Sequence, residues 1–355
     1  MQVAIVGAGI IGASLAYALG RQGAQVTIVD AAGPAAGATG ASFGWINASY
    51  YADAAHFALR AASIEAYRQL CRVLDVPVYW SGCLCWEEEG EALEAQERDL
   101  RALGYHARIV DRAELARLEP QVKAADRAIL FEDEAAAEPG SLTQALLKAS
   151  GARVMTGCRV SGILAKGSRV CGLRIPGGDL PADAVVVAGG NGSTDLLSPL
   201  GVALPMLDRP GVIFRTAPIA PTLSHICVAP AGEFRQTPEG QIVMPTAVSN
   251  QADDTNRIWA RPDQLADAAL ERLQAMLPGT KLVWQDVALA QRPVPQDGLP
   301  VVGACGPEGL FTAVMHSGIT LAPVVAEILS AQVLGAALSN AQQALIAPYR
   351  PDRFG

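Results

Sequence analysis

The N-terminal stretch, residues 2–30, reads QVAIVGAGIIGASLAYALGRQGAQVTIVD. Its two ends, residues 2–6 and 25–30, are short β-branched runs of the kind that form strands. Residues 10–22 between them place apolar side chains at helical spacing. A strand, a helix and a second strand in this order form a βαβ unit, so the stretch predicts an α/β fold built on a parallel sheet.

Three glycines, Gly7, Gly9 and Gly12, occupy the turn between the first strand and the helix. In a Gly-x-Gly-x-x-Gly turn the first glycine permits the tight bend, the second lets the backbone approach a pyrophosphate, and the third lets the helix pack closely on the strand. The helix N-terminus adds free N–H groups and a positive dipole end. Asp30, eighteen residues after Gly12, is placed to accept hydrogen bonds from ribose hydroxyls and to repel a 2′-phosphate. The motif predicts a bound dinucleotide, with NADP the least favoured, and leaves FAD and NAD open.

The later part of the chain divides into two patterns. Residues 184–188 form an apolar run that suits a strand buried on both faces. Residues 205–290 are mostly short β runs, interrupted by one helix near 263–277, and predict a second, antiparallel domain. A strand at 310–314 and an apolar helix at 319–334 then return to the α/β pattern. We therefore expect a discontinuous first domain with the β-rich part inserted into it.

Composition and charge exclude several classes of protein. Half of the residues are hydrophobic and 17% are charged, which is typical of a folded globular protein. The net charge of −8 comes without a cluster of Lys and Arg, so we expect no nucleic-acid partner. No apolar run approaches the ~20 residues that span a bilayer, and a strand that begins at Gln2 leaves no room for a signal peptide, so we expect a cytoplasmic protein without a transmembrane segment. The seven cysteines are odd in number and form no CxxC pair, so we expect neither a disulfide framework nor a metal site.

Two segments near the C-terminus resemble those of a known family. Residues 291–303 read QRPVPQDGLPVVG, similar to the Arg-Pro and Asp-Gly-x-Pro signature of the FAD-dependent D-amino-acid oxidase, glycine oxidase and sarcosine oxidase superfamily. Residues 311–323 read FTAVMHSGITLAP, similar to the strand, glycine turn and helix that close this family's fold. Residues 39–44 resemble its Ser/Gly-rich loop beneath the flavin, and residues 188–190 resemble its flavin-side strand. The resemblance covers nearly the whole chain.

This resemblance implies a division into two domains. The first would be a glutathione-reductase-like FAD domain with two dinucleotide-binding, Rossmann-type units, formed by residues 1–75, 140–200 and 290–355. The second would be an antiparallel α+β substrate domain that roofs the isoalloxazine ring, formed by residues 76–139 and 201–289. The order of the segments agrees with the strand and helix patterns.

The resemblance also implies which residues bind FAD. By analogy, Val160 lines the adenine site, and the helix N-terminus in residues 316–322 lies over the pyrimidine end of the flavin and stabilises negative charge at N1 of the reduced ring. Relatives with a covalent flavin use a cysteine near the Arg-Pro segment. Residues 291–300 contain none, so we expect non-covalent FAD. The expected FAD-binding residues are Gly7, Gly9, Ile10, Ile11, Gly12, Asp30, Ala31, Thr39, Gly40, Ala41, Ser42, Val160, Ala188, Gly189, Gly190, Gly318, Ile319, Thr320 and Leu321.

Arg292 is the predicted anchor for the substrate and the first candidate catalytic residue. A guanidinium beside an apolar flavin face can hold a substrate carboxylate through two hydrogen bonds and orient the Cα–H toward flavin N5. Glycine oxidases and D-amino acid oxidases resemble the chain at this position. The alternative is a structural arginine that pairs with Asp297 or Asp286.

Three other side chains are candidates for the site. His316 can hydrogen-bond the flavin or take a proton, and we favour a positioning role because members of this family transfer hydride without an essential base. Phe214 and Met244 lie on predicted roof strands and are candidates for lining the substrate pocket. Ordinary core packing is the alternative for both.

These residues together predict FAD-dependent oxidation of a C–N bond in a small amino acid or amine, of the D-amino acid, glycine or N-substituted glycine type. Hydride transfer to flavin N5 would give an imine that hydrolyses. Two alternatives stay open: a FAD-dependent 2-hydroxy-acid dehydrogenase and a non-catalytic flavin-binding subunit of a larger dehydrogenase. Residues 241–248 resemble a strand that carries an oxygen-activating lysine in sarcosine-oxidase-like relatives, yet they contain no lysine. The electron acceptor, oxygen or another molecule, therefore stays open, as does a homo-oligomer.

Overall fold

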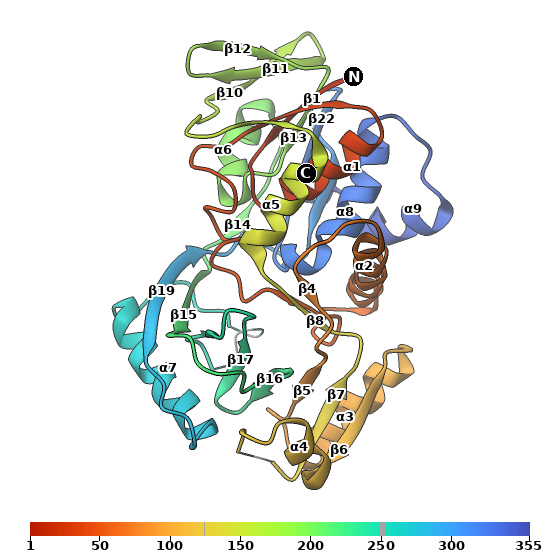
Figure 1. The fold of residues 1–355 in the computed structure, drawn as a ribbon. Helices are drawn as coiled ribbons and strands as arrows, with labels where there is room; N and C mark the ends of the chain where they lie inside the picture. The colour runs from red at the N-terminus through yellow and green to blue at the C-terminus, as the bar shows by residue number, and fades with distance from the viewer. Residues whose placement is uncertain (124, 249–250, 252) are drawn as a thin grey trace.

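Two large β-sheets dominate the structure, a computed structural model that describes residues 1–123, 125–248, 251 and 253–355. Figure 1 shows one sheet in the upper half of the molecule and the other in the lower half. The helices lie on the outside of both sheets. The structure confirms the predicted α/β fold.

The upper sheet has six strands in the order β21-β22-β13-β1-β2-β9. Neighbouring strands are parallel, except that β21 and β22 are antiparallel. Every residue of β13, and all but the first residue of β1, is buried, as expected of parallel strands covered on both faces. The strands are β1 (Gln2–Val6), β2 (Gln25–Val29), β9 (Arg153–Met155), β13 (Ala184–Val187), β21 (Val301–Ala304) and β22 (Leu310–Val314).

Helices cover one face of this sheet and a small antiparallel sheet covers the other. On the first face α1 (Ile10–Arg21) contacts α5 (Pro139–Ser150) and α8 (Gly318–Val333). On the second face Val170 and Leu173 of the small sheet share a core with Val185 and Val187 of β13. The small sheet consists of β10 (Gly162–Lys166), β11 (Arg169–Ile175) and β12 (Gly178–Pro181).

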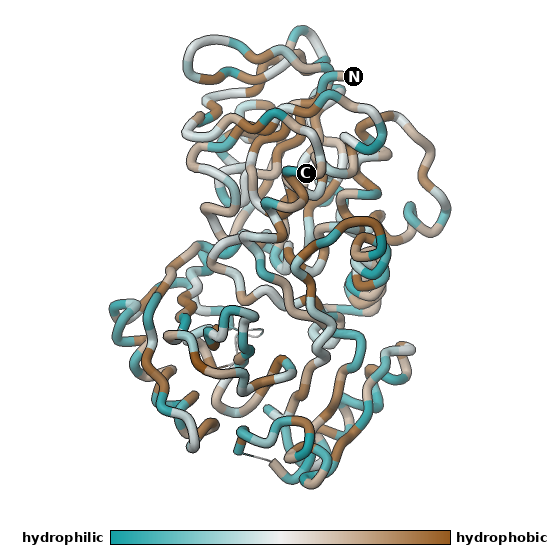
Figure 2. Tube along the Cα trace, viewed as in Figure 1, coloured by the Kyte–Doolittle hydropathy of each residue, from teal (hydrophilic) through white to brown (hydrophobic). Residues whose placement is uncertain are grey.

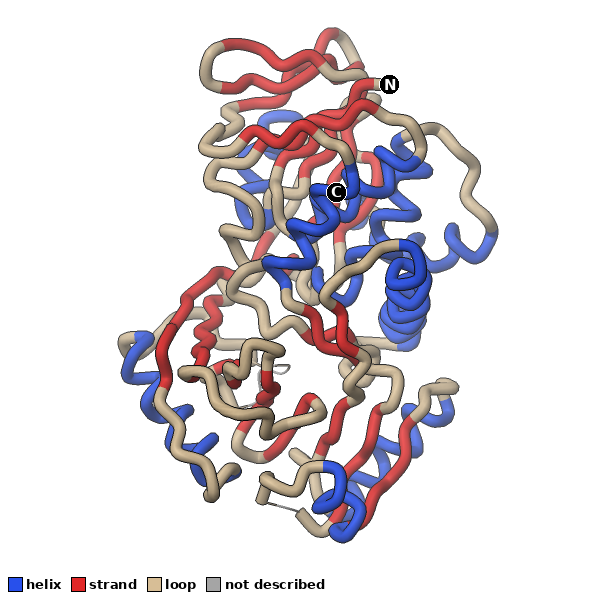
Figure 3. Tube along the Cα trace, viewed as in Figure 1, coloured by secondary structure: helices blue, strands red, loops and turns tan. Residues whose placement is uncertain are grey.

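The lower sheet has eight strands in the order β19-β15-β18-β17-β16-β5-β7-β6, and its pairs are antiparallel apart from β16 with β5. Figure 3 shows helix α7 (Pro262–Met276) along one end of it, with α3 (Gly90–Ala102) and α4 (Arg112–Leu118) at the other end. The helix predicted near 263–277 is α7. The strands are β5 (Cys83–Cys85), β6 (Ala107–Asp111), β7 (Arg127–Phe131), β15 (Pro210–Thr216), β16 (Ile226–Ala229), β17 (Gly232–Gln236), β18 (Ile242–Pro245) and β19 (Trp284–Gln291).

A short sheet of β3 (Trp45–Ile46), β8 (Ala135–Ala137) and β4 (Val78–Tyr79) lies between the two large sheets (Figure 1). Beside it α2 (Ala54–Val73) packs against α8 and exposes Glu65, Gln69 and Arg72. Figure 2 shows hydrophilic segments along this helix. The remaining α-helices and strands are α6 (Ser193–Leu197), α9 (Asn340–Ile346) and the strand pair β14 (Met206–Leu207) with β20 (Val294–Pro295). Among the described residues no helix has the length and apolar character needed to cross a bilayer.

Candidate active site

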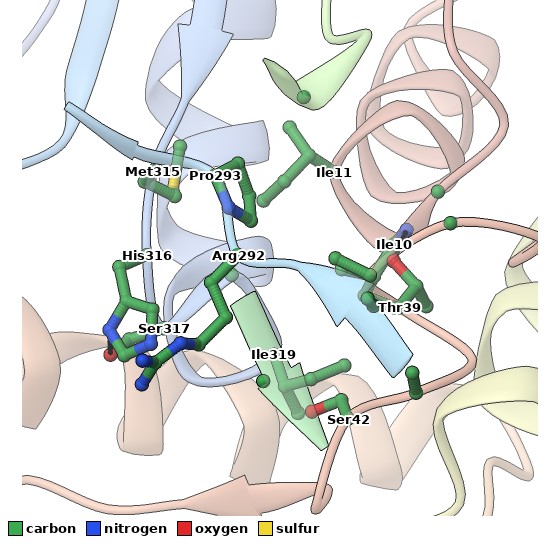
Figure 4. A pocket seen from close by; sticks show the side chains of 18 of the residues that line it. Ile10, Ile11, Thr39, Ser42, Arg292, Pro293, Met315, His316, Ser317 and Ile319 are labelled. Carbon is green, nitrogen blue, oxygen red and sulfur yellow. Dashed lines mark hydrogen bonds between the residues drawn. The ribbon is translucent and has the colours of Figure 1, made fainter. Parts of the chain in front are cut away.

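A pocket of about 280 Å³ lies at the carboxyl ends of the central parallel strands. Gly7 after β1, Asp30 after β2 and Gly189 after β13 line it, which is where open α/β sheets bind their ligands. Residues of β15 and β18, together with Ala290, Arg292 and Pro293, also line it. The upper and the lower sheet therefore both contribute to one cavity, which Figure 4 shows from close by.

The glycine turn is packed too tightly for side chains at two of its three glycines. Gly7 has a φ of +106°, and a Cβ on it would lie 2.4 Å from the carbonyl oxygen of Ala188. A Cβ on Gly12 would lie 2.0 Å from the carbonyl oxygen of Gly7. Gly9 has an ordinary φ of −74°, and a Cβ there would meet only the Thr39 hydroxyl, at 3.1 Å. The turn thus has the cradle expected for a pyrophosphate, and at Gly9 a side chain is opposed by space rather than by the backbone conformation.

The Asp30 carboxylate stabilises this turn through two hydrogen bonds. Its Oδ2 accepts a hydrogen bond from the Ala8 N–H, and its Oδ1 accepts one from the Ala32 N–H, both at 2.8 Å. Each carboxylate oxygen can still accept another hydrogen bond, as a ribose hydroxyl requires. Thr39 Oγ1 accepts a hydrogen bond from the Ile10 N–H at 3.1 Å, at the start of α1. These contacts agree with a nucleotide site at the N-terminus of α1.

The first turn of α8 is held in place by α2 and β3. Ser63 Oγ donates to the carbonyl oxygen of Thr320 at 2.6 Å, and Tyr67 donates to that of Ile319 at 2.5 Å. Thr320 Oγ1 in turn donates to the carbonyl oxygen of Trp45 at 3.0 Å. Ser317, with a left-handed φ of +56°, turns the chain into this helix. The N-terminus of α8, with its positive dipole end, is therefore fixed at the pocket.

His316 is a neutral imidazole near pH 7. Burial, together with the charges of Arg292, Arg60 and His56, lowers its pKa to about 3. Its Nδ1 lies 3.3 Å from the Ser317 hydroxyl. A histidine in this state takes part in hydrogen bonds but is a weak base. The structure therefore favours a positioning role over proton abstraction.

The Arg292 guanidinium lies next to the His316 ring (Figure 4). Its Nη2 donates to Oδ2 of Asp253 at 2.7 Å, and its Nε donates to the carbonyl oxygen of Arg209 at 3.3 Å. Both members of the ion pair are largely buried, with side-chain exposures of 15% and 12%. The guanidinium thus already holds one carboxylate at the wall of the pocket.

Neither of the alternative partners predicted for Arg292 is correct. Asp297 pairs with Arg353 at 2.8 Å, and Asp286 pairs with Arg215 at 3.3 Å. The ion pair forms instead with Asp253, which lies in the connection between β18 and α7. Partners in irregular connections have no sequence period that would reveal them.

A second arginine, Arg60, lines the pocket from α2. It is only 2% exposed, and its Nε and Nη2 donate to the carbonyl oxygen and Oδ1 of Asn47 at 3.0 and 2.5 Å. Burial lowers its pKa to about 10, partly offset by the charge of Glu134, so it stays protonated at neutral pH.

Most of the predicted site residues line the pocket. They are Gly7, Gly9, Ile10, Ile11, Asp30, Thr39, Ala41, Ser42, Ala188, Gly189, Gly190, Arg292, His316, Gly318, Ile319 and Thr320. Other predicted residues do not reach it: Gly12 packs against Gly7, Val160 and Leu321 are buried in cores, Gly40 packs against Ala35, and Ala31 is exposed. The adenine contact of Val160 stays a prediction.

The expectation that Phe214 and Met244 line the substrate pocket is wrong. Both are fully buried in the core between the lower sheet and α7, together with Leu273. Their neighbours Ile213 and Pro245 line the pocket instead. Successive side chains of a strand point to opposite faces, so a shift of one residue exchanges pocket and core.

Several pocket residues were not predicted from the sequence: Asn47, Arg60, Ile213, Pro245, Gln251 and Ala290. One of them, Arg60, had a detectable signal. It lies three residues after Phe57 and four before Ile64, on the buried face of α2, where a charged residue is unusual.

Several known proteins resemble this chain along nearly its whole length. The family model DAO, described as FAD dependent oxidoreductase, matches residues 2–332. Glycine oxidase of Pseudomonas putida is 27% identical over 375 residues, which cover 99% of this chain and 98% of that protein. D-amino acid dehydrogenase of Allorhizobium ampelinum is 25% identical over 425 residues and all of both chains. The solved structure of glycine oxidase from Bacillus cereus has a TM-score of 0.84 at 22% identity and covers 97% of both chains, which shows a shared fold.

Proposed function

Because the chain belongs to the family of FAD-dependent oxidoreductases, we propose that it oxidises the C–N bond of a small amino acid whose carboxylate is held by Arg292. Amino acid oxidation in general follows from its relatives, among them glycine oxidase and D-amino acid dehydrogenase. The observation that carries the role of Arg292 is its contact with Asp253. Arg292 lines the pocket and its guanidinium binds a carboxylate at 2.7 Å, which supports a role in binding the substrate carboxylate.

The residues of the pocket fit FAD. The glycine turn would hold the pyrophosphate and Asp30 the ribose, while residues 39–42 and 188–190 would contact the flavin. When bound, FAD supplies the acceptor for the two electrons and the hydrogen of the substrate C–H bond. The chain then has to bind the amino acid, orient its Cα–H and exclude water.

Arg292 performs the first two of these tasks in our proposal. The substrate carboxylate replaces that of Asp253 on the guanidinium, and two parallel hydrogen bonds fix the direction of the Cα–H bond. The apolar side chains of Ile213 and Pro245 lie on the same wall and exclude water.

An amine substrate is favoured over a 2-hydroxy acid because of His316. Oxidation of a hydroxy acid needs a base for the hydroxyl proton, and a histidine with a pKa of about 3 is a poor one. The test is anaerobic mixing of the FAD-loaded protein with D-amino acids, glycine derivatives and hydroxy acids. We expect an amino acid to bleach the flavin. Bleaching by hydroxy acids alone would favour the dehydrogenase alternative, and bleaching by neither would favour a non-catalytic subunit.

Four further points stay predictions. They are the non-covalent attachment of FAD, the electron acceptor, the cytoplasmic location and the division into an FAD domain and a substrate domain. The strands of the six-stranded sheet all fall within residues 1–75, 140–200 and 290–355, which supports the proposed division.

A further inference from the structure

Arg60 is a buried cation without a matching anion in the described part of the chain. Its hydrogen bonds to the described residues both go to Asn47, which is uncharged, and it forms no ion pair with those residues. It nevertheless stays protonated, since burial lowers its pKa only to about 10. Buried charges in proteins are normally paired because an isolated charge loses its hydration. A counter-charge is therefore expected from a ligand.

The carboxylate of Glu134 does not fill this role. It is fully buried and accepts hydrogen bonds from Trp45 Nε1 at 2.8 Å, Tyr105 at 3.0 Å and the Ser49 N–H at 3.3 Å. Burial raises its pKa to about 7, so near neutral pH it carries only part of a negative charge. It also forms no ion pair with Arg60 among the described residues.

The position of Arg60 identifies the anion that it would face. Asn47, which Arg60 contacts, donates its own N–H to Thr320 Oγ1 at 3.4 Å, in the first turn of α8. Arg60, Asn47 and Thr320 all line the pocket. The guanidinium and the positive dipole end of α8 thus act on the same region of the pocket.

We infer that Arg60 is the counter-charge for the pyrimidine edge of reduced FAD. With FAD bound in this pocket, breaking the substrate C–H bond would transfer its hydrogen and both electrons to the cofactor and leave the substrate as an iminium. Reduction would thus add one negative charge to the cofactor, and a cation at its pyrimidine edge would stabilise that charge. Arg60 stabilises that charge and so makes FAD easier to reduce. This role rests on the proposed placement of FAD in the pocket.

The experiment compares Arg60→Gln with Arg60→Lys and with Arg68→Gln, a control on the same helix that pairs with Asp133. The probes are sulfite, which adds to N5 and leaves the same negative charge on the ring, and acetate, which represents a substrate carboxylate. For Arg60→Gln we expect an at least tenfold higher Kd for sulfite and an acetate Kd within threefold of wild type. If the reduced form of FAD is stabilised tenfold less relative to the oxidised form, the midpoint potential falls by about 30 mV for a two-electron couple.

Two results would overturn the inference. One is a midpoint potential and sulfite Kd in Arg60→Gln equal to those of Arg68→Gln. The other is a tenfold loss of acetate binding with an unchanged potential, which would make Arg60 a substrate anchor. If Arg60→Gln fails to retain FAD, the test uses Arg60→Lys. Burial lowers the pKa of a lysine below ~10.4, so this variant should lose its positive charge, and with it sulfite affinity, between pH 7 and 9.5. A pH profile of sulfite affinity like that of wild type would contradict the inference. None of these measurements needs a substrate, so they test the inference separately from the proposed function. The proposed function itself would be contradicted if the wild-type protein contained no FAD.

Discussion

The floor and the roof of the pocket are built by different means. The floor, residues 7–12 with the end of β13, makes its closest contacts through the backbone: a Cβ on Gly12 would lie 2.0 Å from a carbonyl oxygen. The roof, made of β15, β18 and Arg292, presents side chains, such as the guanidinium 2.7 Å from Asp253. A backbone surface admits few substitutions, whereas side chains on a strand can change without altering the fold. Under the proposed function, substitutions in the roof can therefore change the substrate while the floor keeps the same cofactor.

The largest expected effect is the loss of FAD through a substitution in the floor. In Gly9→Val the fold should survive, because Gly9 has an ordinary φ of −74° and its Cβ would meet only the Thr39 hydroxyl. The valine side chain would occupy the space of the pyrophosphate, so we expect purified protein without FAD, measured by flavin absorbance after desalting. The control is Gly140→Ala in α5, outside the pocket, whose Cβ would meet nothing within 4 Å and which should retain FAD fully. Wild-type flavin content in Gly9→Val would mean that the turn binds no cofactor.

A smaller effect separates the two faces of the roof strand β15. Phe214→Ala should lower the free energy of unfolding by ~3–5 kcal/mol, because it leaves a cavity in the core beside α7, and KM should not change. Ile213→Ala, one residue away, should raise KM because Ile213 lines the pocket. Denaturant unfolding and steady-state kinetics of both variants measure this. A raised KM in Phe214→Ala alone would place the pocket on the other face.

The next prediction concerns Asp253 of the roof, whose carboxylate would compete with the substrate carboxylate for Arg292. Removing the charge in Asp253→Asn should lower KM for the amino acid about tenfold, since a hydrogen bond to a charged group contributes ~1.5–3 kcal/mol and the substrate no longer has to displace one. The control is Asp286→Asn, which removes an exposed ion pair with Arg215 and should leave KM unchanged. A higher KM in Asp253→Asn would show that Asp253 positions Arg292 instead of competing with the substrate.

The smallest effect is the pH dependence of stability that His316 introduces between floor and roof. Its pKa in the folded protein is about 3, below the ordinary 6.5, so the unfolded chain binds a proton that the folded chain excludes. Stability is then lost as the pH falls from 6.5 toward 3, by at most about 1.4 kcal/mol per pH unit. His316→Asn should flatten the free energy of unfolding between pH 6.5 and 5. Equal slopes in the wild-type protein and in His316→Asn would contradict this assignment.

The floor was largely predictable from the sequence, whereas the roof was predictable only at Arg292. Gly7 and Gly12 are recognisable because close backbone contacts leave no other residue, and β1 is recognisable because both of its faces are buried. On β15 the apolar pattern does not distinguish its two buried faces, so Phe214 was assigned to the pocket in place of Ile213.

Charged partners were the other difficulty. Arg292 was recognisable from its motif, but Asp253 was not, because the two meet only through the irregular connection between β18 and α7. Arg60 lies on a helix whose apolar stripe indicates core packing, and only its charge on the buried face distinguishes it. Tertiary contacts of single side chains leave no periodic trace in the sequence.

The most direct test of the account is the rate of Arg292→Ala with an amino acid and with the matching amine that lacks the carboxylate. Leaving one member of a buried charge pair without its partner costs ~2–5 kcal/mol, so kcat/KM for the amino acid should fall roughly 30-fold to several thousand-fold. The value for the amine should barely change and FAD content should stay near wild type, whereas Tm should fall because the Asp253 carboxylate is left without its partner. Arg292→Lys should recover part of the loss, because an ammonium keeps the charge without the planar two-point contact. An equal loss for amino acid and amine, or loss of flavin, would contradict the account and make Arg292 a structural arginine.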